Sequence, residues 1–318
     1  MTQYQSSQYR FLGLDDEWAN PDRAGVEIIP VPYDVTSSYG RGSDQGPSAI
    51  CESSSQLEMF DAFLGFVPYE PWGGVVTAEP VDIYIDGSSR VPLSGGALAD
   101  RLEVRVREAM ARRRLVVTLG GEHTSIVGAV RAYSRRFLEE GRPLTILQFD
   151  AHSDLRDEYE GTPWSHACAM ARILDFHDQI AQVGIRSQIE SERALTTARN
   201  IPVFYGEAIP REDTPDFIDW LDALIESLNP DVYITFDCDS LNPSVVPATG
   251  TPEPGGLNWR QINRILEQIA LQKNIVGFDV SELAPIPGLT YPQFTIAKLI
   301  VRCLGYIAKG KSFQSSRS

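Results

Sequence analysis

Cysteine is scarce in this sequence. The 318 residues include only Cys51, Cys168, Cys238 and Cys303, and no two of them form a CxxC pair. A zinc knuckle or a disulfide framework needs closely spaced or paired cysteines, so the spacing argues against both. We expect four free thiols in a reducing compartment.

Long apolar runs are also missing. No stretch approaches the roughly 20 consecutive apolar residues that a membrane-spanning helix needs. The N-terminal segment, MTQYQSSQYRFLGLDDEW, lacks the basic start and apolar core of a signal peptide. We therefore expect a cytoplasmic protein that has no membrane partner.

Basic residues are fewer than acidic ones in this sequence. The chain has 28 Lys and Arg residues against 43 Asp and Glu residues, which gives a net charge of −15 and an isoelectric point of about 4.7. Surfaces that bind nucleic acid are basic, so nucleic acid is not an expected partner. The acidic balance is compatible with a cationic substrate.

Several familiar site motifs are absent. There is no HExxH zinc motif and no Walker phosphate loop, and DCDSLNP (237–243) departs from an EF-hand loop at Leu241 and at the glycine that should follow. The segment GRGSDQG (40–46) resembles a dinucleotide loop only superficially, because its third glycine comes one residue late. We interpret this segment as a rim of the substrate site that leads into a helix starting near Pro47.

Short apolar runs rich in Val and Ile alternate with stretches of helical periodicity. Several runs are continuous, as expected of central strands that are covered on both faces. The predicted strands span residues 25–31, 81–86, 115–120, 144–150, 180–186, 201–206, 231–237 and 274–280. The predicted helices, in which apolar residues recur every three or four positions, span residues 94–114, 125–141, 213–228 and 258–272.

This alternation predicts a single α/β domain over residues 1–318. The sheet should be mainly parallel, with about eight strands and with helices on both faces. No internal repeat, low-complexity segment or linker divides the pattern. We expect about the first 20 residues and residues 309–318 to be poorly ordered.

Four of the predicted strands end in ionisable residues. In open α/β sheets ligands bind outside the carboxyl ends of the strands, so these residues should converge at one edge. On an extended chain, the alternate spacing within 150–154 and within 237–239 would also place the side chains of each group on one face. The residues are His123 after the third predicted strand, Asp150, His152 and Asp154 after the fourth, Asp237 and Asp239 after the seventh, and Glu282 after the eighth.

Four carboxylates and two imidazoles gathered in one place indicate a metal centre. The negative charges would repel one another strongly without cations. One divalent ion cannot use all six groups, whereas two ions about 3.5–4 Å apart can, with some carboxylates bridging. The set is rich in oxygen and contains no thiolate, which favours Mn²⁺ and leaves Ni²⁺, Fe²⁺ and Co²⁺ open. Cys238 lies between two candidate ligands, but on a strand its side chain should point into the core. The candidate ligands are His123, Asp150, His152, Asp154, Asp237 and Asp239.

Four segments resemble the signatures of the ureohydrolases, the family of arginases and agmatinases. They are GGEHTS (120–125), FDAHSDLRDEYEGTPWSHA (149–167), FDCDSLNPSVVPATGTPEPGGL (236–257) and FDVSELAP (278–285), within a resemblance that covers roughly residues 25 to 305. The resemblance is greatest to agmatinases, also in PYDVTSSYGRGSDQGPSAI (32–50). It implies a three-layer α/β/α fold of the arginase type, a two-manganese centre and the hydrolysis of a guanidino group to an amine and urea.

The resemblance also implies roles for individual residues. His123, Asp150, Asp154 and Asp237 would hold one or both ions, and His152 and Asp239 would complete the set. His166 matches the family's mobile histidine, which acts as a proton shuttle or general acid, and Glu282 matches the glutamate that grips the guanidinium. With Asp154, these two form the expected catalytic group. Elementary chemistry agrees, since bound ions lower the pKa of water and a carboxylate can orient a guanidinium through two parallel hydrogen bonds. Family members often form trimers or hexamers, which implies a homo-oligomer.

The residues after Asp154 bear on the choice of substrate. Arginases have an asparagine two residues after the last aspartate, where this chain has Arg156. Arg156 could bind a carboxylate, which leaves arginine and 4-guanidinobutyrate open. Asp157 and Glu158 suit a decarboxylated cation such as agmatine better, or they belong to a solvated loop without contact to the substrate. Trp164 could pack against the methylene chain of the substrate or belong to the core.

We therefore expect an agmatinase that releases putrescine and urea in polyamine biosynthesis. One alternative is another guanidino hydrolase of the family, acting on guanidinobutyrate, guanidine or arginine and using manganese or nickel. The other alternative is a metal-binding relative without activity, which should have lost a ligand or the pair His166 and Glu282. None of these residues is missing.

Overall fold

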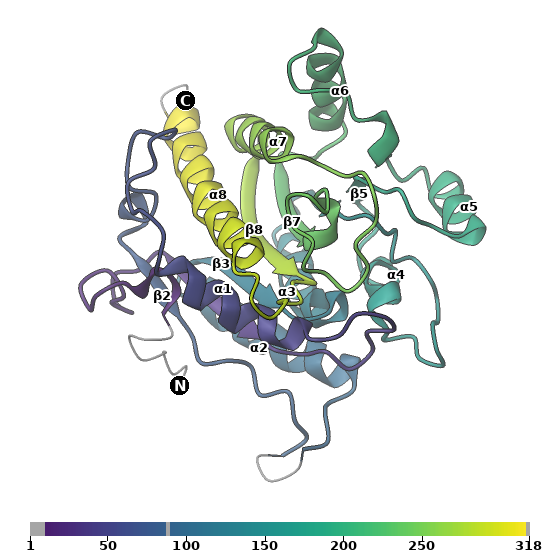
Figure 1. Ribbon diagram of the computed structural model, residues 1–318, viewed down its shortest axis with the longest axis horizontal. Helices are drawn as coiled ribbons and strands as arrows, with labels where there is room; N and C mark the ends of the chain where they lie inside the picture. The colour runs from purple at the N-terminus through teal and green to yellow at the C-terminus, as the bar shows by residue number, and fades with distance from the viewer. Residues whose placement is uncertain (1–9, 87–89, 316–318) are drawn as a thin grey trace.

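Eight strands form one sheet in which every pair of neighbours is parallel (Figure 1). The structure is a computed structural model that describes residues 10–86 and 90–315. The strand order across the sheet is β2-β1-β3-β8-β7-β4-β5-β6. In chain order the strands are β1 (Val26–Val31), β2 (Val75–Thr77), β3 (Leu115–Gly120), β4 (Leu144–Phe149), β5 (Ile180–Val183), β6 (Val203–Phe204), β7 (Asp231–Asp237) and β8 (Asn274–Ser281).

Helices cover both faces of the sheet and give three layers, α/β/α. One hydrophobic core lies between the sheet and helices α1, α6, α7 and α8, and a second core lies between the opposite face and helices α2, α3 and α4. Figure 1 shows α7 and α8 side by side over the central strands. The helices are α1 (Gly46–Ser54), α2 (Gly95–Ala111), α3 (Val127–Glu139), α4 (Ala169–Leu174), α5 (Glu190–Ala198), α6 (Pro215–Glu226), α7 (Trp259–Gln272) and α8 (Tyr291–Ser315). The predicted fold class is therefore confirmed.

Burial on two faces explains the continuous apolar runs. Every residue of β1, β3, β4 and β7 is buried, so polar residues cannot alternate along these strands unless they find partners. Local signals fix the helix starts. Asn258 accepts hydrogen bonds from the amides of Arg260 and Gln261, both at 2.8 Å, and so places the start of α7 at Trp259. The predicted helix near Pro47 is α1.

The prediction of a strand at residues 81–86 is wrong. Val81 still donates its amide to Pro30 O (2.9 Å), but Tyr84 only forms an isolated bridge with Pro92, and Ile85 is exposed. The alternating apolar residues of VDIYID therefore lie in a loop that leaves the sheet. The sheet position beside β1 is taken by the three residues of β2, which are too few to give a sequence signal.

Three helices, α4, α5 and α8, have no counterpart among the predicted ones. The first two are short, with six and nine residues. Helix α8 is long, but Ile296, Ala297, Leu299, Ile300, Val301, Cys303 and Leu304 are all buried. Burial over most of its circumference hides the spacing of three or four residues by which a surface helix is recognised.

Parts of both ends that we expected to be poorly ordered have a defined place in the structure, and the expectation about their order stays a prediction. Phe11 and Leu12 are buried in the core, and their amides donate to Thr77 Oγ1 (2.8 Å) and Ser54 Oγ (2.6 Å). At the other end, α8 continues to Ser315. Residues 1–9 and 316–318 of that expectation lie outside the described residues. The single domain over the whole chain stays a prediction.

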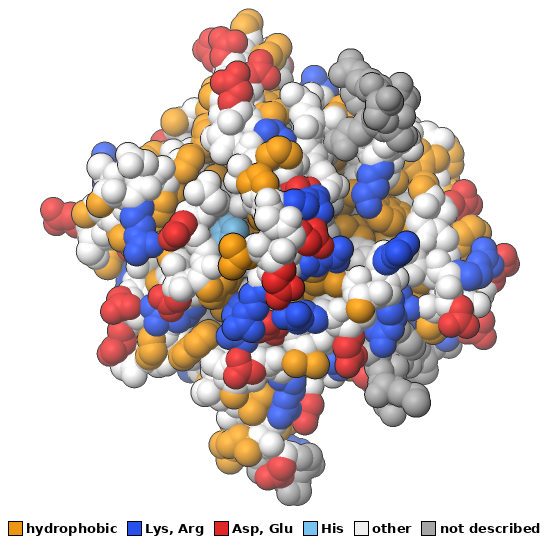
Figure 2. Space-filling view, turned by 180° about the vertical axis from the view of Figure 1, so that it is seen from behind, with side chains coloured by type: hydrophobic (Ala, Val, Ile, Leu, Met, Phe, Trp, Pro, Cys, Tyr) orange, Lys and Arg blue, Asp and Glu red, His pale blue; other side chains and the backbone are white. Residues whose placement is uncertain are grey.

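Charge is mixed on the surface despite the net charge of −15. In the view from behind, basic and acidic side chains are interspersed (Figure 2). Below the surface, the buried carboxylate of Glu103 on α2 pairs with Arg131 and Arg135 on α3, both at 2.6 Å. Among the described residues, no helix combines the length and apolar character that crossing a membrane would require.

Asp61 anchors the segment between α1 and β2 to α8. Its buried carboxylate contacts Lys298 Nζ at 2.7 Å and Arg302 Nε at 3.2 Å. Burial alone would raise the pKa of Asp61, but the hydrogen bond with Lys298, the amide of Leu64 and the charge of Arg302 outweigh it and lower the pKa to about 2. The ionised carboxylate therefore stabilises the fold.

Asp61→Asn should lower the free energy of unfolding at pH 7 by about 1–2 kcal/mol, allowing for solvent screening. The folded pKa lies below the unfolded one, so the stabilisation is complete above about pH 5 and fades as the pH falls from 4 towards 2. Urea unfolding of both proteins at pH 7 and pH 3 measures this, and the difference should shrink by about half at pH 3. A difference that does not change with pH would show that the lost contacts, not the charge, matter.

Candidate metal centre and active site

The four ionisable clusters lie at the carboxyl ends of neighbouring strands. Strands β3, β8, β7 and β4 are adjacent in that order, and because they are parallel their carboxyl ends share one edge. His123 follows β3, Glu282 follows β8, Asp237 ends β7, and Asp150 follows β4. The structure thus brings together the residues that the sequence places at four separate strand ends.

The local backbone differs from the extended chain that we expected. Asp154 has φ +52°, in the left-handed region, and Asp239 lies in the 3-10 turn η8 (Cys238–Ser240). The side chains converge because the chain turns back on itself after each strand, not because alternate residues of a strand share a face. Cys238, as expected, is buried in the apolar core.

Two groups of potential ligands share one carboxylate. The first consists of His123, Asp150 and Asp237, and the second of Asp150, His152 and Asp239; within each group the ligand atoms lie within 4.8 Å of one another. Nδ1 of His123 is 3.1 Å from Asp150 Oδ2 and 3.6 Å from Asp237 Oδ2. Asp154 Oδ2 adds a further oxygen 2.9 Å from the same nitrogen.

The second group is equally close. Nδ1 of His152 is 2.9 Å from Asp239 Oδ2 and 3.7 Å from Asp150 Oδ1. Asp150 thus offers one oxygen to each group. Two adjacent sites that share a carboxylate are the arrangement that a pair of divalent cations requires.

The electrostatics of the cluster also fit cations. Burial, followed by the charge of Asp239, raises the pKa of Asp150 to about 7, and burial with the same neighbour raises the pKa of Asp237 well above its ordinary value. Burial opposes the protonation of His123 and His152, but their aspartate partners outweigh it and raise both pKa values. The carboxylates therefore lack enough positive partners within the protein itself. Their oxygen atoms and the two imidazoles are donors that suit divalent metal ions.

Buried residues next to the cluster hold His123 and Asp150 in place through hydrogen bonds. His123 Nε2 lies 3.0 Å from Thr235 Oγ1, which donates to Asp279 Oδ1 at 2.9 Å. This partner leaves Nδ1 free to face the acids. Gln148 Nε2 donates to Asp150 Oδ2 at 2.7 Å and so fixes the shared carboxylate.

Sequence reasoning missed these supporting residues. Gln148 on β4 is paired in register with Gln182 on β5, both are fully buried, and Gln182 Nε2 also donates to Ser153 O at 2.9 Å. Arg186 donates to backbone carbonyls of Asp239 and Glu253, at 2.7 and 2.9 Å. The available signal was a polar residue inside an otherwise apolar strand, which needs a buried partner.

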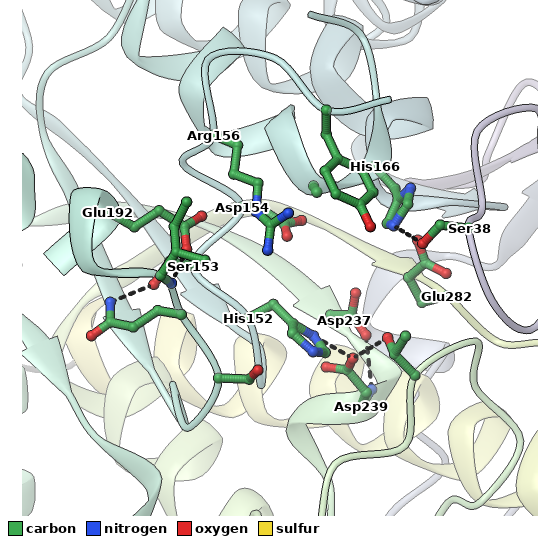
Figure 3. Close-up of a pocket in the computed structure, with 16 residues that line it drawn as sticks. Ser38, His152, Ser153, Asp154, Arg156, His166, Glu192, Asp237, Asp239 and Glu282 are labelled. Carbon is green, nitrogen blue, oxygen red and sulfur yellow. Dashed lines mark hydrogen bonds and ion pairs between the residues drawn. The ribbon is translucent and has the colours of Figure 1, made fainter. Parts of the chain in front are cut away.

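A cavity of about 220 Å³ opens above the two groups (Figure 3). Figure 3 shows His152 and Asp239 on one side of it, His166, Ser38 and Glu282 on another, and Arg156 extending towards its centre. Its lining includes His152, Asp154, Arg156, His166, Asp237, Asp239 and Glu282. Seven of the predicted site residues therefore face one space.

Glu282 is buried beside the first ligand group. Its Oε1 accepts a hydrogen bond from the amide of His123 at 2.7 Å, and its backbone has φ +62°. Burial and the charge of Glu122 raise the pKa of Glu282 well above its ordinary value. A strained backbone and an unbalanced carboxylate are typical of a residue held ready for a cationic ligand.

His166 lies on the same side of the cavity as Glu282 (Figure 3), at the start of the 3-10 turn η6 (His166–Cys168). Its Nε2 is 3.4 Å from Ser38 Oγ, and the Tyr159 ring meets its imidazole edge-on, with the centroids 5.9 Å apart. Burial lowers the pKa of His166. The lowered pKa keeps the imidazole mainly neutral at pH 7, so it can take up a proton and pass it on.

Of the four predicted substrate contacts other than Glu282, only Arg156 lines the cavity. Its guanidinium lies 4.5 Å from the centroid of the Tyr159 ring. Asp157 is 99% exposed and pairs with Arg172 at 2.9 Å, and Glu158 is also exposed. The Trp164 ring packs against Gly95 and Gly96 at the start of α2, which is the core alternative for this residue. The loop after Asp154 turns outwards, so its acids face solvent.

Comparison with known proteins bears directly on this site. The model of the family described as "Arginase family" matches residues 24–305. The chain belongs to the arginase family. It is a ureohydrolase, a hydrolase that acts on C–N bonds, and the resemblance drawn from its motifs is confirmed.

Individual arginase-family proteins are similar over nearly the whole chain. The N(1)-aminopropylagmatine ureohydrolase of Synechocystis sp. is 35% identical over 284 residues, which are 89% of each chain. The agmatinase of Pyrococcus horikoshii is 30% identical over 309 residues, 95% of this chain and 99% of that one. The crystal structure of the agmatine ureohydrolase of Thermoplasma volcanium superposes with a TM-score of 0.80 over 97% of both chains, at 26% identity.

Proposed function

We propose that this arginase-family ureohydrolase uses two Mn²⁺ ions to hydrolyse agmatine to putrescine and urea. The observation that carries the proposal is the pair of ligand groups that share Asp150 beneath a cavity lined by Glu282 and His166. Family membership supplies the reaction class.

In this proposal the six predicted ligands divide between two ions. His123, Asp154 and Asp237 would hold one ion, His152 and Asp239 would hold the other, and Asp150, which belongs to both ligand groups, would contribute to each. Two bound divalent ions supply what side chains lack, because they lower the pKa of a water molecule and so provide a nucleophile at neutral pH.

The chain's own residues bind the substrate and move protons. The carboxylate of Glu282 accepts two parallel hydrogen bonds from the planar guanidinium and sets its orientation. As water oxygen bonds to the guanidino carbon, the bond to the alkyl nitrogen breaks and that nitrogen needs a proton. His166, which lines the same cavity, takes up a proton that the attacking oxygen gives up as it becomes the carbonyl oxygen of urea, and passes it to this nitrogen. The products are urea and the protonated amine.

A second substrate is favoured by one observation. Several similar proteins are named N(1)-aminopropylagmatine ureohydrolase, with identities of 32–36%. An aminopropyl extension lengthens the tail and adds a charge, while the guanidino end is unchanged. The same machinery would therefore cut both compounds.

The experiment that tests the proposed function is a urea assay. The purified chain, loaded with Mn²⁺ or with Ni²⁺, is incubated with agmatine, N(1)-aminopropylagmatine, 4-guanidinobutyrate, guanidine and arginine. We expect the highest kcat/KM for agmatine or its aminopropyl derivative with Mn²⁺. Turnover of only the other three compounds would contradict the substrate, higher activity with Ni²⁺ would contradict the metal, and no urea from any compound would contradict the function.

Arg156 provides a test of tail charge. Among the described residues it is the one Lys or Arg side chain that lines the cavity. Arg156→Gln should raise kcat/KM for agmatine relative to 4-guanidinobutyrate by about 3–10-fold, because a cationic tail no longer meets a fixed positive charge. Arg172→Gln, outside the lining, is the matched control. An unchanged ratio would show that Arg156 does not face the tail.

The proposal includes a cytoplasmic homo-oligomer, a trimer or hexamer, that acts in polyamine biosynthesis. These points rest on the composition and on the resemblance to the family. Light scattering of the purified chain measures its mass in solution, and a monomer at micromolar concentration would contradict this part alone.

A further inference from the structure

A hydrogen-bond path joins His166 to a loop from the other side of the active site. The amide of His166 donates to Thr36 Oγ1 at 2.9 Å, and the same hydroxyl lies 3.5 Å from His166 Nδ1. Thr36 belongs to the connection between β1 and α1, 130 residues away along the chain. The Thr36 hydroxyl therefore ties the start of η6 to this connection.

The other end of this path is the buried carboxylate of Glu122. Thr36 Oγ1 donates to Glu122 Oε1 at 2.9 Å, while Oε2 accepts from the amides of Val35 (2.9 Å) and Thr36 (2.6 Å). Glu122 has no exposed surface and does not line the cavity. Its oxygens are directed at the loop, so it is unsuited to holding a metal ion or substrate.

Close packing makes the loop a firm support. The amide of Glu122 donates to Tyr33 O at 2.8 Å, and a Cβ atom on Gly121 would lie only 2.2 Å from that oxygen. Only glycine allows this approach, so the loop rests directly on the chain that leads into His123. Further along, the same loop presents Ser38 Oγ to His166 Nε2 (Figure 3).

We propose that Thr36, braced by Glu122, is a positioning residue for His166. The inference rests on the proposed role of His166 as the proton donor. The Thr36 hydroxyl accepts from the histidine amide and donates to a buried carboxyl oxygen of Glu122, so both of its hydrogen-bonding roles are already taken. The Tyr159 ring makes a further, edge-on contact with the imidazole. These contacts hold the imidazole at the cavity, whose lining includes His166.

Two substitutions at Thr36 separate the hydroxyl from the shape of the side chain. Thr36→Val keeps the volume and removes both hydrogen bonds, whereas Thr36→Ser keeps them. Thr36→Val should lower kcat by about 10–30-fold, since small displacements of a catalytic group are costly, and should leave KM and metal content within about 2-fold. Thr36→Ser should retain most of the activity. Normal kcat in the valine variant, or equal loss in both variants, would overturn the inference.

A double-mutant cycle tests whether Thr36 acts through His166. In the background of His166→Ala, Thr36→Val should cost nothing further, because the group that it positions is gone. Equal losses in both backgrounds would mean that Thr36 merely supports the loop, and would overturn the inference. If His166→Ala has no measurable turnover, the comparison of valine with serine decides.

A readout without turnover is available because the chain has only four histidines. In the metal-free chain, the imidazole NMR signal of His166 should shift and broaden in Thr36→Val and recover in Thr36→Ser. His177, which contacts Leu144 O at 3.1 Å away from the cavity, is the internal control. An unchanged His166 signal in Thr36→Val would contradict the inference. If the wild type releases no urea, the proposed function is wrong. The NMR experiment still shows whether Thr36 positions His166, because it does not depend on turnover.

Discussion

Asp237→Asn should remove most of the bound metal and lower kcat by about 100–1,000-fold. Asp237 Oδ2 lies 3.6 Å from Nδ1 of His123 in the first ligand group, while Oδ1 accepts the amide of Asp239 at 2.8 Å. Asparagine preserves the volume and that hydrogen bond but loses the anionic charge that a divalent ion needs. Metal content by mass spectrometry and the rate of urea release, measured on the same sample, check this.

Without metal, the same substitution should not destabilise the protein. Burial and neighbouring carboxylates raise the pKa of Asp237, which means that its charge is unfavourable without cations. The metal-free variant should therefore melt at the same temperature as the metal-free wild type or higher. Asp157→Asn, at an exposed position, is the control and should bind metal normally. A variant of Asp237 that keeps two ions per chain would remove this residue from the ligand set.

Glu282→Gln should keep the metal but lose about 100–1,000-fold in kcat/KM. The glutamine oxygen can still accept from the His123 amide, so the shape of the site is preserved. The substrate guanidinium, however, would enter a buried site without its carboxylate partner, at a cost of about 3–4 kcal/mol. Steady-state kinetics and metal analysis of the variant measure both effects.

Comparison of the two variants identifies their roles. Metal loss in Asp237→Asn with metal retained in Glu282→Gln is the expected pattern. Equal metal loss in both would mean that Glu282 is a ligand and not the substrate anchor. Unchanged kcat/KM in Glu282→Gln would place the guanidinium elsewhere in the cavity.

Much of the fold could be predicted because its signals are local. The long strands β3, β4, β7 and β8 are largely apolar runs, a pattern that is typical of strands covered on both faces. Strand β2 could not be predicted, since three residues carry too little pattern and the stronger alternation lies at 81–86. Helix α8 was missed for a different reason, because most of its apolar residues are buried and its few polar residues, Lys298 and Arg302 among them, mark only a narrow face.

The candidate ligands could be predicted for a topological reason. Polar residues directly after parallel strands meet at one edge wherever the strands are neighbours, whatever the loops do in detail. The turn at Asp154 and the 3-10 turn at Asp239 were not foreseen, yet they do not change which side chains meet.

The supporting residues depend on contacts between distant segments. Thr36 reaches His166 and Glu122 only because the β1–α1 loop folds over Gly121. Gln148 and Gln182 meet only in the register of β4 and β5. The sequence around each of these residues does not indicate which distant residue it contacts. The outward turn of Asp157 and Glu158 is likewise set by the loop and not by their charge.

The number of Mn²⁺ ions per chain in the form that releases urea tests the central claim most directly. Metal-free protein is titrated with Mn²⁺, and bound metal and urea release from agmatine, or from whichever guanidino compound is turned over, are measured at each step. We predict that activity rises until two ions are bound per chain and then stays constant, with neighbouring ions visible as magnetic coupling in electron paramagnetic resonance. Full activity at one ion per chain, or urea release by the metal-free protein, would contradict the two-ion centre built around Asp150.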